Sequence, residues 1–264
     1  MTDDAALRDG AGATPSPTQS IRVAASGDIH CSRSRESQIL ESLAKVSNEA
    51  DLLLLAGDLT TQGEPEEAEA LAEVCAALGV PVVAVLGNHD WHAGRADEVI
   101  RVLSEAGVTM LDRSSCIHES AIGEIGIVGA KGFIGGFAGS HLPDFGEPPL
   151  REVYAETSRH VDAIDRGLRD VANCPVRIVL MHYSPCLETL EGEREGIITF
   201  LGCDRMAAPI LEHSPDLVLH GHAHNGRLRG TIGEVPVFNV SAPVMRRGFW
   251  TFEFSGAEAV APIH

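Results

Sequence analysis

The sequence lacks a long apolar run and has few basic residues. A membrane-spanning helix needs about 20 consecutive, mostly apolar residues. Because the apolar runs here are far shorter, we expect no membrane-spanning segment. Lys and Arg number 20 against 38 Asp and Glu, so the formal net charge is -18. A surface this acidic repels polyanions, which excludes nucleic-acid polymers and anionic membranes as expected partners but not a small phosphate ester in a locally positive pocket.

The cysteines lack the close pairs that mark a zinc ribbon or a redox motif. All six are scattered, with no C-x-x-C spacing. The first twenty residues also lack the basic start and hydrophobic stretch of a signal peptide. We therefore expect reduced thiols in a cytoplasmic protein. Residues 1–20 have no periodicity and are expected to be a disordered tail before a folded domain over 21–264.

Short apolar runs alternate with amphipathic stretches in the first part of this domain. The sequence predicts strands at Ile21–Ser26, Leu52–Ala56 and 82–86, with helices between them near 39–50 and 65–79. Three strand–helix units in succession indicate a parallel sheet built from βαβ crossovers.

The rest of the chain continues this pattern less regularly. Residues 131–149 are rich in Gly and Pro and are expected to form a long surface loop. We expect helices near 99–106 and 150–171. Strands are expected at 108–111, 125–130, 176–181, 217–219, 235–240 and 249–254, the last two closing a second sheet.

Five of the expected strands are followed by side chains that can bind metals. The clearest case is the run Leu217 to His224, which ends in two imidazoles, two positions apart after Gly221. Outside a helix, side chains at this spacing can face the same way. In open α/β sheets, ligands bind at the carboxyl ends of the strands. The candidates collected there are Asp28, His30, Asp58, Asn88, His89, His182, His222 and His224.

Taken singly, these residues have simpler explanations. Asp28 or Asp58 after a glycine can be a turn or cap residue, and Asn88 can be a turn residue. His182 can be a hydrogen-bonded core histidine. Taken together, five such strand ends favour a shared site. Carboxylate, amide and imidazole donors without thiolates suit Mn, Fe or Zn. Seven potential ligands, His89 not counted, exceed what one metal needs and point to two ions about 3.5–4 Å apart.

Five blocks of the sequence resemble, in order, the signature of the calcineurin-like metallophosphoesterase family. They are Gly27-Asp28-Ile29-His30, Gly57-Asp58, Gly87-Asn88-His89-Asp90, His182 and Gly221-His222-Ala223-His224. The resemblance implies a four-layer α/β/β/α sandwich with two mixed sheets. It also implies a dimetal site that hydrolyses phosphate esters with a hydroxide held between the two metals.

The same resemblance implies a role for each residue. Asp28, His30 and His224 would hold one metal, and Asn88, His182 and His222 the other, while Asp58 would bridge both. His89 would protonate the leaving oxygen or stabilise its charge, and Asp90 would orient the imidazole of His89.

Departures from known subfamilies narrow the expected substrate. After Asp58 the chain lacks the Asp-Arg-Gly of phosphoprotein phosphatases, and Asp90 stands where those enzymes have Glu. Ile29-His30 fill the place of the tyrosine ligand of purple acid phosphatases. The DNA-binding parts that DNA-repair nucleases of the family usually carry are also missing. We therefore expect a small-molecule phosphodiesterase, similar to cyclic-nucleotide phosphodiesterases. A phosphomonoesterase and a non-catalytic interaction module, like the metallophosphoesterase-like subunit of retromer, are the alternatives.

Overall fold

The computed structural model describes residues 20–255 and the backbone of residues 258–259. The tail expected at residues 1–20 therefore lies outside the described residues, apart from Ser20. Within the described part, no helix combines the length and apolar character needed to cross a membrane. All six cysteines are free thiols.

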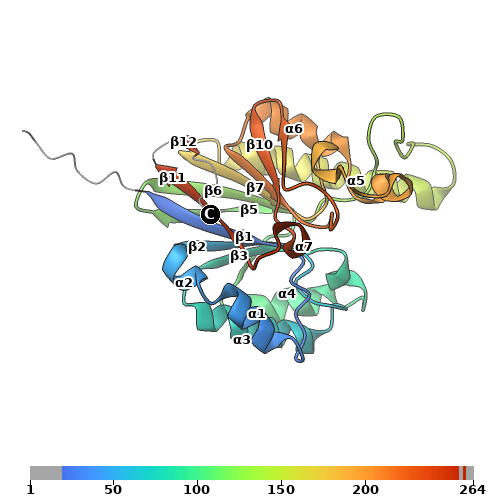
Figure 1. Ribbon diagram of the computed structural model, residues 1–264. Helices are drawn as coiled ribbons and strands as arrows, with labels where there is room; N and C mark the ends of the chain where they lie inside the picture. The colour runs from blue at the N-terminus through green and yellow to red at the C-terminus, as the bar shows by residue number, and fades with distance from the viewer. Residues whose placement is uncertain (1–19, 256–257, 260–264) are drawn as a thin grey trace, which may run out of the picture.

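Two six-stranded sheets lie face to face (Figure 1). In the first, β1 to β4 run parallel, whereas β11 runs antiparallel to β1 and β12 antiparallel to β11. Its strand order is β12 (Glu258–Ala259), β11 (Trp250–Ser255), β1 (Ile21–Ser26), β2 (Leu52–Ala56), β3 (Val82–Val85) and β4 (Thr109–Met110).

The second sheet is also mixed. Strands β6, β7, β8 and β10 run parallel, and β5 and β9 are antiparallel edge strands. Its order is β5 (Ser114–Ser120), β6 (Gly123–Ala130), β7 (Val176–Met181), β8 (Leu217–His220), β10 (Val235–Asn239) and β9 (Arg229–Ile232).

Helices cover the outer face of each sheet, which confirms the expected four-layer α/β/β/α sandwich (Figure 1). The first sheet carries α1 (Glu36–Leu43), α2 (Val46–Glu49), α3 (Pro65–Leu78) and α4 (Ala96–Glu105), and the second carries α5 (Pro148–Asp170) and α6 (Ala207–His213). The remaining short helices are η1 (His89–Trp91), η2 (Glu188–Leu190), η3 (Glu195–Phe200), η4 (Asp204–Met206) and α7 (Ala242–Met245).

Strand β2 shows why the buried strands read as continuous apolar runs. Its sequence is Leu-Leu-Leu-Leu-Ala, and every residue is buried. Side chains alternate between the two faces of a strand. Leu53 and Leu55 therefore pack against the helices, whereas Leu52 and Leu54 pack in the core between the sheets. Both faces are covered, so both must be apolar.

Two sequence-based expectations about these elements are wrong. The last strand belongs to the first sheet and not to the second, because β11 pairs with β1, with Ile21 opposite Phe254. Phe252 and Phe254 face the core shared by both sheets, so the apolar pattern predicts a strand without specifying its partner. The helix expected near 39–50 is two short helices, α1 and α2, separated by residues 44–45.

Strand β5 was not expected from the sequence. It reads Ser-Ser-Cys-Ile-His-Glu-Ser and has no buried residue, because it lies at the edge of its sheet and pairs only with β6. The loop expected at 131–149 contains no helix or strand before α5 begins at Pro148. It is nevertheless anchored, since Gly136 forms a β-bridge with Cys203.

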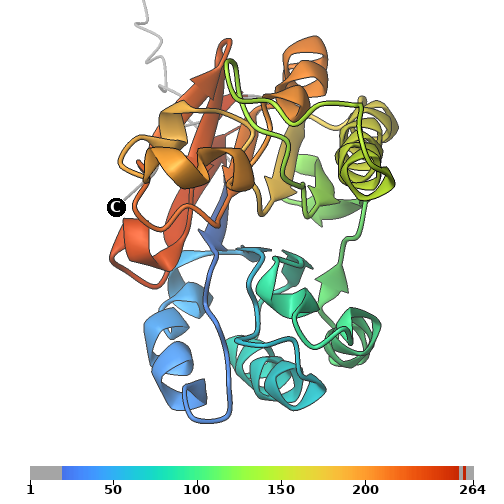
Figure 2. The same ribbon diagram turned by 90° about the vertical axis from the view of Figure 1, so that its right-hand side faces the viewer.

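The carboxyl edges of the two sheets adjoin. In Figure 1, β1 runs from left to right, so this edge faces the viewer in Figure 2. Gly27, directly after β1, forms a parallel bridge with Ser241, which follows β10 of the other sheet. The backbone N–H of Asp28 donates to Gly57 O (3.0 Å), and that of Gly221 donates to His182 O (3.1 Å). The loops after β1, β2, β7, β8 and β10 thus meet at one place.

Helix α5 buries a histidine that should make stability depend on pH. His160 is 1% exposed, and neither ring nitrogen forms a hydrogen bond in the described structure, although Nε2 lies 3.2 Å from Glu156 Oε1. Burial lowers its pKa from 6.5 to about 4. Below about pH 6.5 this histidine is protonated in the unfolded chain but stays neutral in the folded chain. The free energy of unfolding therefore decreases as the pH falls from about 6.5 to about 4.

We therefore expect His160→Phe, which removes the titrating ring, to raise the free energy of unfolding relative to the natural chain more at pH 5 than at pH 8. Urea unfolding at the two pH values measures this difference. An equal change at both would show that His160 does not contribute to acid sensitivity.

Candidate metal centre

Four of the expected site residues adopt an unusual backbone conformation. The φ angles of Asp28, His30, Asp58 and His222 are 56°, 44°, 49° and 69°. Positive φ is uncommon outside glycine, costs on the order of 1–3 kcal/mol and clusters at functional sites. The loops after β1, β2 and β8 thus hold strained positions where the candidate ligands lie, which supports a functional role for this edge.

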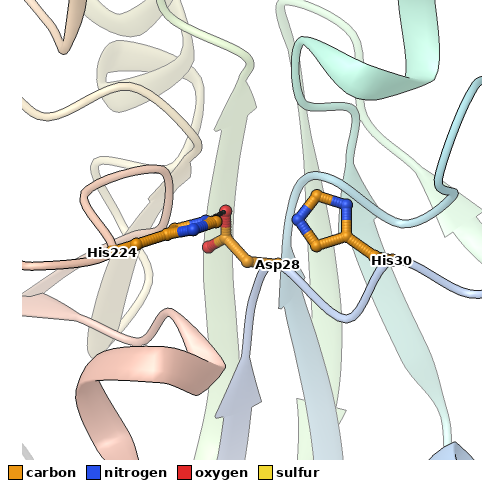
Figure 3. A group of neighbouring side chains, drawn as sticks. All are labelled: Asp28, His30 and His224. Atoms are coloured by element: carbon orange, nitrogen blue, oxygen red, sulfur yellow. Dashed lines mark hydrogen bonds and ion pairs between the residues drawn. The ribbon is translucent and has the colours of Figure 1, made fainter.

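The first group of side chains is Asp28, His30 and His224, whose ligand atoms all lie within 4.8 Å of one another. Figure 3 shows the two imidazoles on either side of the Asp28 carboxylate. His224 Nε2 is 2.8 Å from Asp28 Oδ1, and the backbone N–H of His222 donates to the same carboxylate. Burial opposes ionisation of Asp28, but the hydrogen bond from His224 and the nearby imidazoles hold its pKa below the usual value. Asp28 is therefore a buried carboxylate kept ionised.

The second group is Asp58, His182 and His222, also within 4.8 Å of one another, with Asn88 beside it. His182 Nδ1 donates to Ala56 O (2.9 Å), so in the neutral ring Nε2 has a lone pair and no proton. That nitrogen lies 2.9 Å from Asn88 Oδ1 and 3.3 Å from Asp58 Oδ1. In this neutral form of the ring, Nε2 and the two oxygens present lone pairs to one another. A cation among them turns this repulsion into attraction, so the donor set fits a metal ion.

His222 is prepared for metal binding in the same way. Its Nε2 donates to Phe200 O (3.2 Å), which leaves the lone pair on Nδ1. Burial lowers the pKa of His222 to about 3, so the ring stays neutral. The neutral imidazole is the form that binds metals.

Asp58 lies between the two groups. Its Oδ1 is 3.3 Å from His182 Nε2, and its Oδ2 is 3.8 Å from His30 Nε2. The side chain is 2% exposed, and no Lys or Arg in residues 20–255 forms an ion pair with it. A buried carboxylate without a positive partner is costly. Asp58 therefore presents one carboxylate oxygen to each group.

His89 lies beside this centre, held by a backbone carbonyl. Its Nδ1 donates to Thr61 O (2.8 Å), and its Nε2 lies 3.9 Å from Asp58 Oδ2. The His89 and His30 rings pack edge to face, with centroids 4.5 Å apart. The Nε2 atom is thereby directed towards the carboxylate of Asp58 and away from the Thr61 carbonyl.

Asp90 does not orient His89, contrary to the sequence-based expectation. Its carboxylate accepts hydrogen bonds from the backbone N–H groups of Leu59, Thr60 and Gly87 at 2.7–3.2 Å, and from the Thr60 hydroxyl. Burial raises the pKa of Asp90 to about 6. Asp90 therefore ties the loop after β2 to the loop after β3, and the Thr61 carbonyl performs the role expected of Asp90.

Sequence reasoning missed two polar residues beside the centre. The Tyr183 ring lies 4.4 Å from the His222 ring, between centroids. Lys131 Nζ lies 5.3 Å from the Tyr183 ring and 5.7 Å from that of Trp91, and burial lowers the Lys131 pKa to about 8. One signal was present: Lys131 directly follows β6, as the candidate ligands follow their strands.

The chain matches one protein family and is similar in fold to several solved structures. The family model described as calcineurin-like phosphoesterase matches residues 21–226. The fold is similar to the phosphopantetheinyl hydrolase of Mycobacterium tuberculosis, with a TM-score of 0.64 and 15% identity over 93% of this chain and 98% of that one. TT1561 of Thermus thermophilus has a TM-score of 0.56 and 19% identity over 83% and 88% of the two chains.

A third similar structure is GAP50, the anchor in the inner membrane complex of Plasmodium. Its TM-score is 0.59, with 11% identity over 93% of this chain and 88% of that one. No curated protein matches the sequence. At these identities the solved structures support the fold alone.

Proposed function

Because the chain belongs to the calcineurin-like phosphoesterase family, whose members are metal-dependent phosphoesterases, we propose that it hydrolyses small phosphodiesters, in the manner of cyclic-nucleotide phosphodiesterases. The observation that carries this proposal is the meeting of Asp58, Asn88 and His182, where Asn88 Oδ1 and Asp58 Oδ1 lie within 3.3 Å of His182 Nε2, the ring nitrogen that does not face Ala56 O. The six free thiols favour a reducing compartment, which supports a cytoplasmic location.

The proposed ligands divide between two ions. Asp58 would bind both, because its two oxygens face different groups. When bound, the ions would supply Lewis-acid activation of the phosphoryl group and of a water nucleophile. Oxygen and nitrogen donors without thiolates favour Mn, Fe or Zn. One ion would take Asp28, His30 and His224, and the other Asn88, His182 and His222.

His89 is the proposed acid for the leaving oxygen. The hydrogen bond to Thr61 O fixes the ring and leaves Nε2 as the nitrogen that can carry a proton towards the substrate. That nitrogen lies 3.9 Å from Asp58 Oδ2, next to the proposed shared ligand. The side chain is 33% exposed, so a substrate can reach it.

We expect His89→Ala to slow the hydrolysis of diesters with poor leaving groups by about 100-fold, the typical contribution of a general acid. Esters with a p-nitrophenoxide leaving group should slow by only a few-fold, because that anion needs no proton to depart. Comparing kcat for p-nitrophenyl and phenyl esters of the same alkyl phosphate separates the two cases.

His92→Ala is a matched control, because the exposed His92 ring packs on His89 with centroids 4.3 Å apart but lies further along the loop. His92→Ala should change kcat for the two esters by the same factor. If His89→Ala also slows both esters equally, His89 is not the acid.

Hydrolysis of bis(p-nitrophenyl) phosphate and of p-nitrophenyl phosphate with added Mn²⁺ tests the proposal. We expect faster turnover of the diester. Preference for the monoester would make the chain a phosphomonoesterase of the same family. No turnover of either would favour a non-catalytic interaction module.

A further inference from the structure

A cavity of about 250 Å³ lies next to Asp28. Asp28 is the only proposed metal ligand among its lining residues, so the other residues that line it have no role in the proposed metal site. Helix α1 forms one wall, and the segment that follows α7 forms the other. Two arginines line it, Arg35 and Arg247, together with polar residues of α1, Gln38 and Ser42. The cavity thus joins a proposed metal ligand to two positive charges.

Arg35 is fixed in place but has unused hydrogen-bond donors. One of its terminal nitrogens donates to His30 O (3.0 Å), which ties the guanidinium to the loop that carries His30. A guanidinium has five N–H donors, and within residues 20–255 no other hydrogen-bond partner of the Arg35 guanidinium is found. Arg33, two positions earlier, binds the carboxylates of Glu36, Glu69 and Glu73. Carboxylates are therefore abundant near α1, yet none neutralises Arg35.

The segment that carries Arg247 is fixed by two long-range contacts, one on either side of that residue. The backbone N–H of Ala242 donates to Gly27 O (3.0 Å), one residue before Asp28. At the other end, a Cβ on Gly248 would overlap the carbonyl oxygen of Ser42, so only glycine permits this close approach of the two backbones. Arg247 has no ion pair among the described side chains. Its Cζ lies 5.5 Å from the centroid of the Trp250 ring and 5.9 Å from that of Phe249, contacts that use the face of the guanidinium and leave its N–H donors unpaired within the described part of the chain. Neither cavity arginine therefore forms an ion pair within residues 20–255, although the chain has a net charge of -18. The Asp28 carboxylate also lines the cavity, but its oxygens are engaged by His222 and His224.

We propose that Arg35 and Arg247 bind a second phosphoryl group of the substrate, beside the one that is hydrolysed. This inference rests on the proposed function and names its substrate class: small phosphodiesters that carry a further phosphate. Guanidinium groups match the geometry of phosphate oxygens and can bind them in a bidentate manner. Two such groups also oppose the negative field of the acidic surface, which would otherwise repel a doubly charged substrate.

The test compares two substrates that differ only in the second phosphate, thymidine 5′-(p-nitrophenyl phosphate) with and without a 3′-phosphate. We expect the natural chain to prefer the 3′-phosphorylated ester, chiefly through a lower KM. The double variant Arg35→Met/Arg247→Met should lose kcat/KM for this ester by about 10- to 100-fold, the usual effect of lost charged hydrogen bonds. For the ester without the 3′-phosphate, Arg247→Met alone, which keeps the hydrogen bond from Arg35 to His30 O, should change kcat/KM by no more than about twofold.

Binding measured without turnover provides a second readout. By calorimetry, thymidine 3′,5′-bisphosphate should bind the natural chain more tightly than thymidine 5′-phosphate, and the double variant should lose this preference. Arg246→Met is the matched control, because it removes the same charge from an adjacent exposed residue that does not line the cavity. If loss of the His30 tether unfolds the double variant, Arg247→Met alone should show the same selective loss.

The outcomes separate this inference from the proposed function. Equal kcat/KM of the natural chain for the two esters would overturn the second-phosphate site. An equal loss of kcat/KM for both esters in the Arg247→Met variant would overturn it as well, because the arginines would then not distinguish the 3′-phosphate. Absence of hydrolysis of either ester, together with absence of nucleotide binding, overturns the proposed function as well.

Discussion

Replacing Asp58 by Asn should lower kcat for bis(p-nitrophenyl) phosphate by on the order of a thousandfold, equivalent to about 4 kcal/mol of transition-state stabilisation. The two oxygens of Asp58 face different groups of imidazoles, at 3.3 and 3.8 Å. An asparagine offers one oxygen and an N–H₂ group that cannot bind a cation, and it also removes a negative charge. The shared ligand is therefore lost, although the side chain keeps its size.

The fold should survive this substitution. The backbone N–H of His89 donates to Asp58 Oδ1 (2.9 Å), and the remaining carbonyl oxygen of an asparagine can accept the same hydrogen bond. Asp162→Asn on the exposed face of α5 makes the same change of charge and should keep full activity. If Asp58→Asn retained more than a tenth of the natural kcat, the carboxylate would not be a shared ligand.

Gly87→Ala should be a damaging single-methyl change in the site. Gly87 directly precedes Asn88, and a Cβ there would overlap the backbone nitrogen and the Oδ1 atom of Asp58. Its own N–H donates to Asp90 Oδ2 (2.7 Å), so it cannot move away freely. Overpacking of this kind costs roughly 1–3 kcal/mol of stability, and a displacement of about 1 Å can cost 100-fold in rate. Urea unfolding and kcat should both report the change.

Gly196→Ala is the matched control for Gly87→Ala. No atom lies within 4 Å of a Cβ at Gly196, and its φ angle lies outside the positive range that favours glycine. We expect its stability to stay within about 0.5 kcal/mol of the natural chain, as for most surface substitutions, with unchanged activity. Equal activity of the two variants would show that the Asp58 loop tolerates displacement.

The sequence predicted the candidate site well because parallel strands end at a common edge. Once five runs were recognised as strands, the polar residues after them had to lie near one another, and the structure brings Asp28, Asp58 and His182 together in this way. The four-layer sandwich followed from the resemblance that those same residues carry. The meeting of these side chains could be predicted from the apolar pattern of each strand and from the common direction of the strands.

Other features depend on contacts that no local pattern specifies. The pairing of β11 with β1 joins the two ends of the described chain, and β5 is an edge strand without an apolar face. Asp90 binds backbone groups of another loop and not the adjacent His89. The cavity beside Asp28 depends on the approach of Gly248 to Ser42, more than 200 positions apart. Spacing in the sequence cannot predict such contacts.

The number of transition-metal ions bound per chain tests the central claim most directly. After removal of metals by a chelator and reconstitution with Mn²⁺ or Zn²⁺, elemental analysis should find two ions per natural chain. His182→Ala and His224→Ala, which alter different groups, should each retain fewer than two. A natural chain that binds no transition metal, or variants that bind as much as it does, would contradict a two-metal centre formed by these residues.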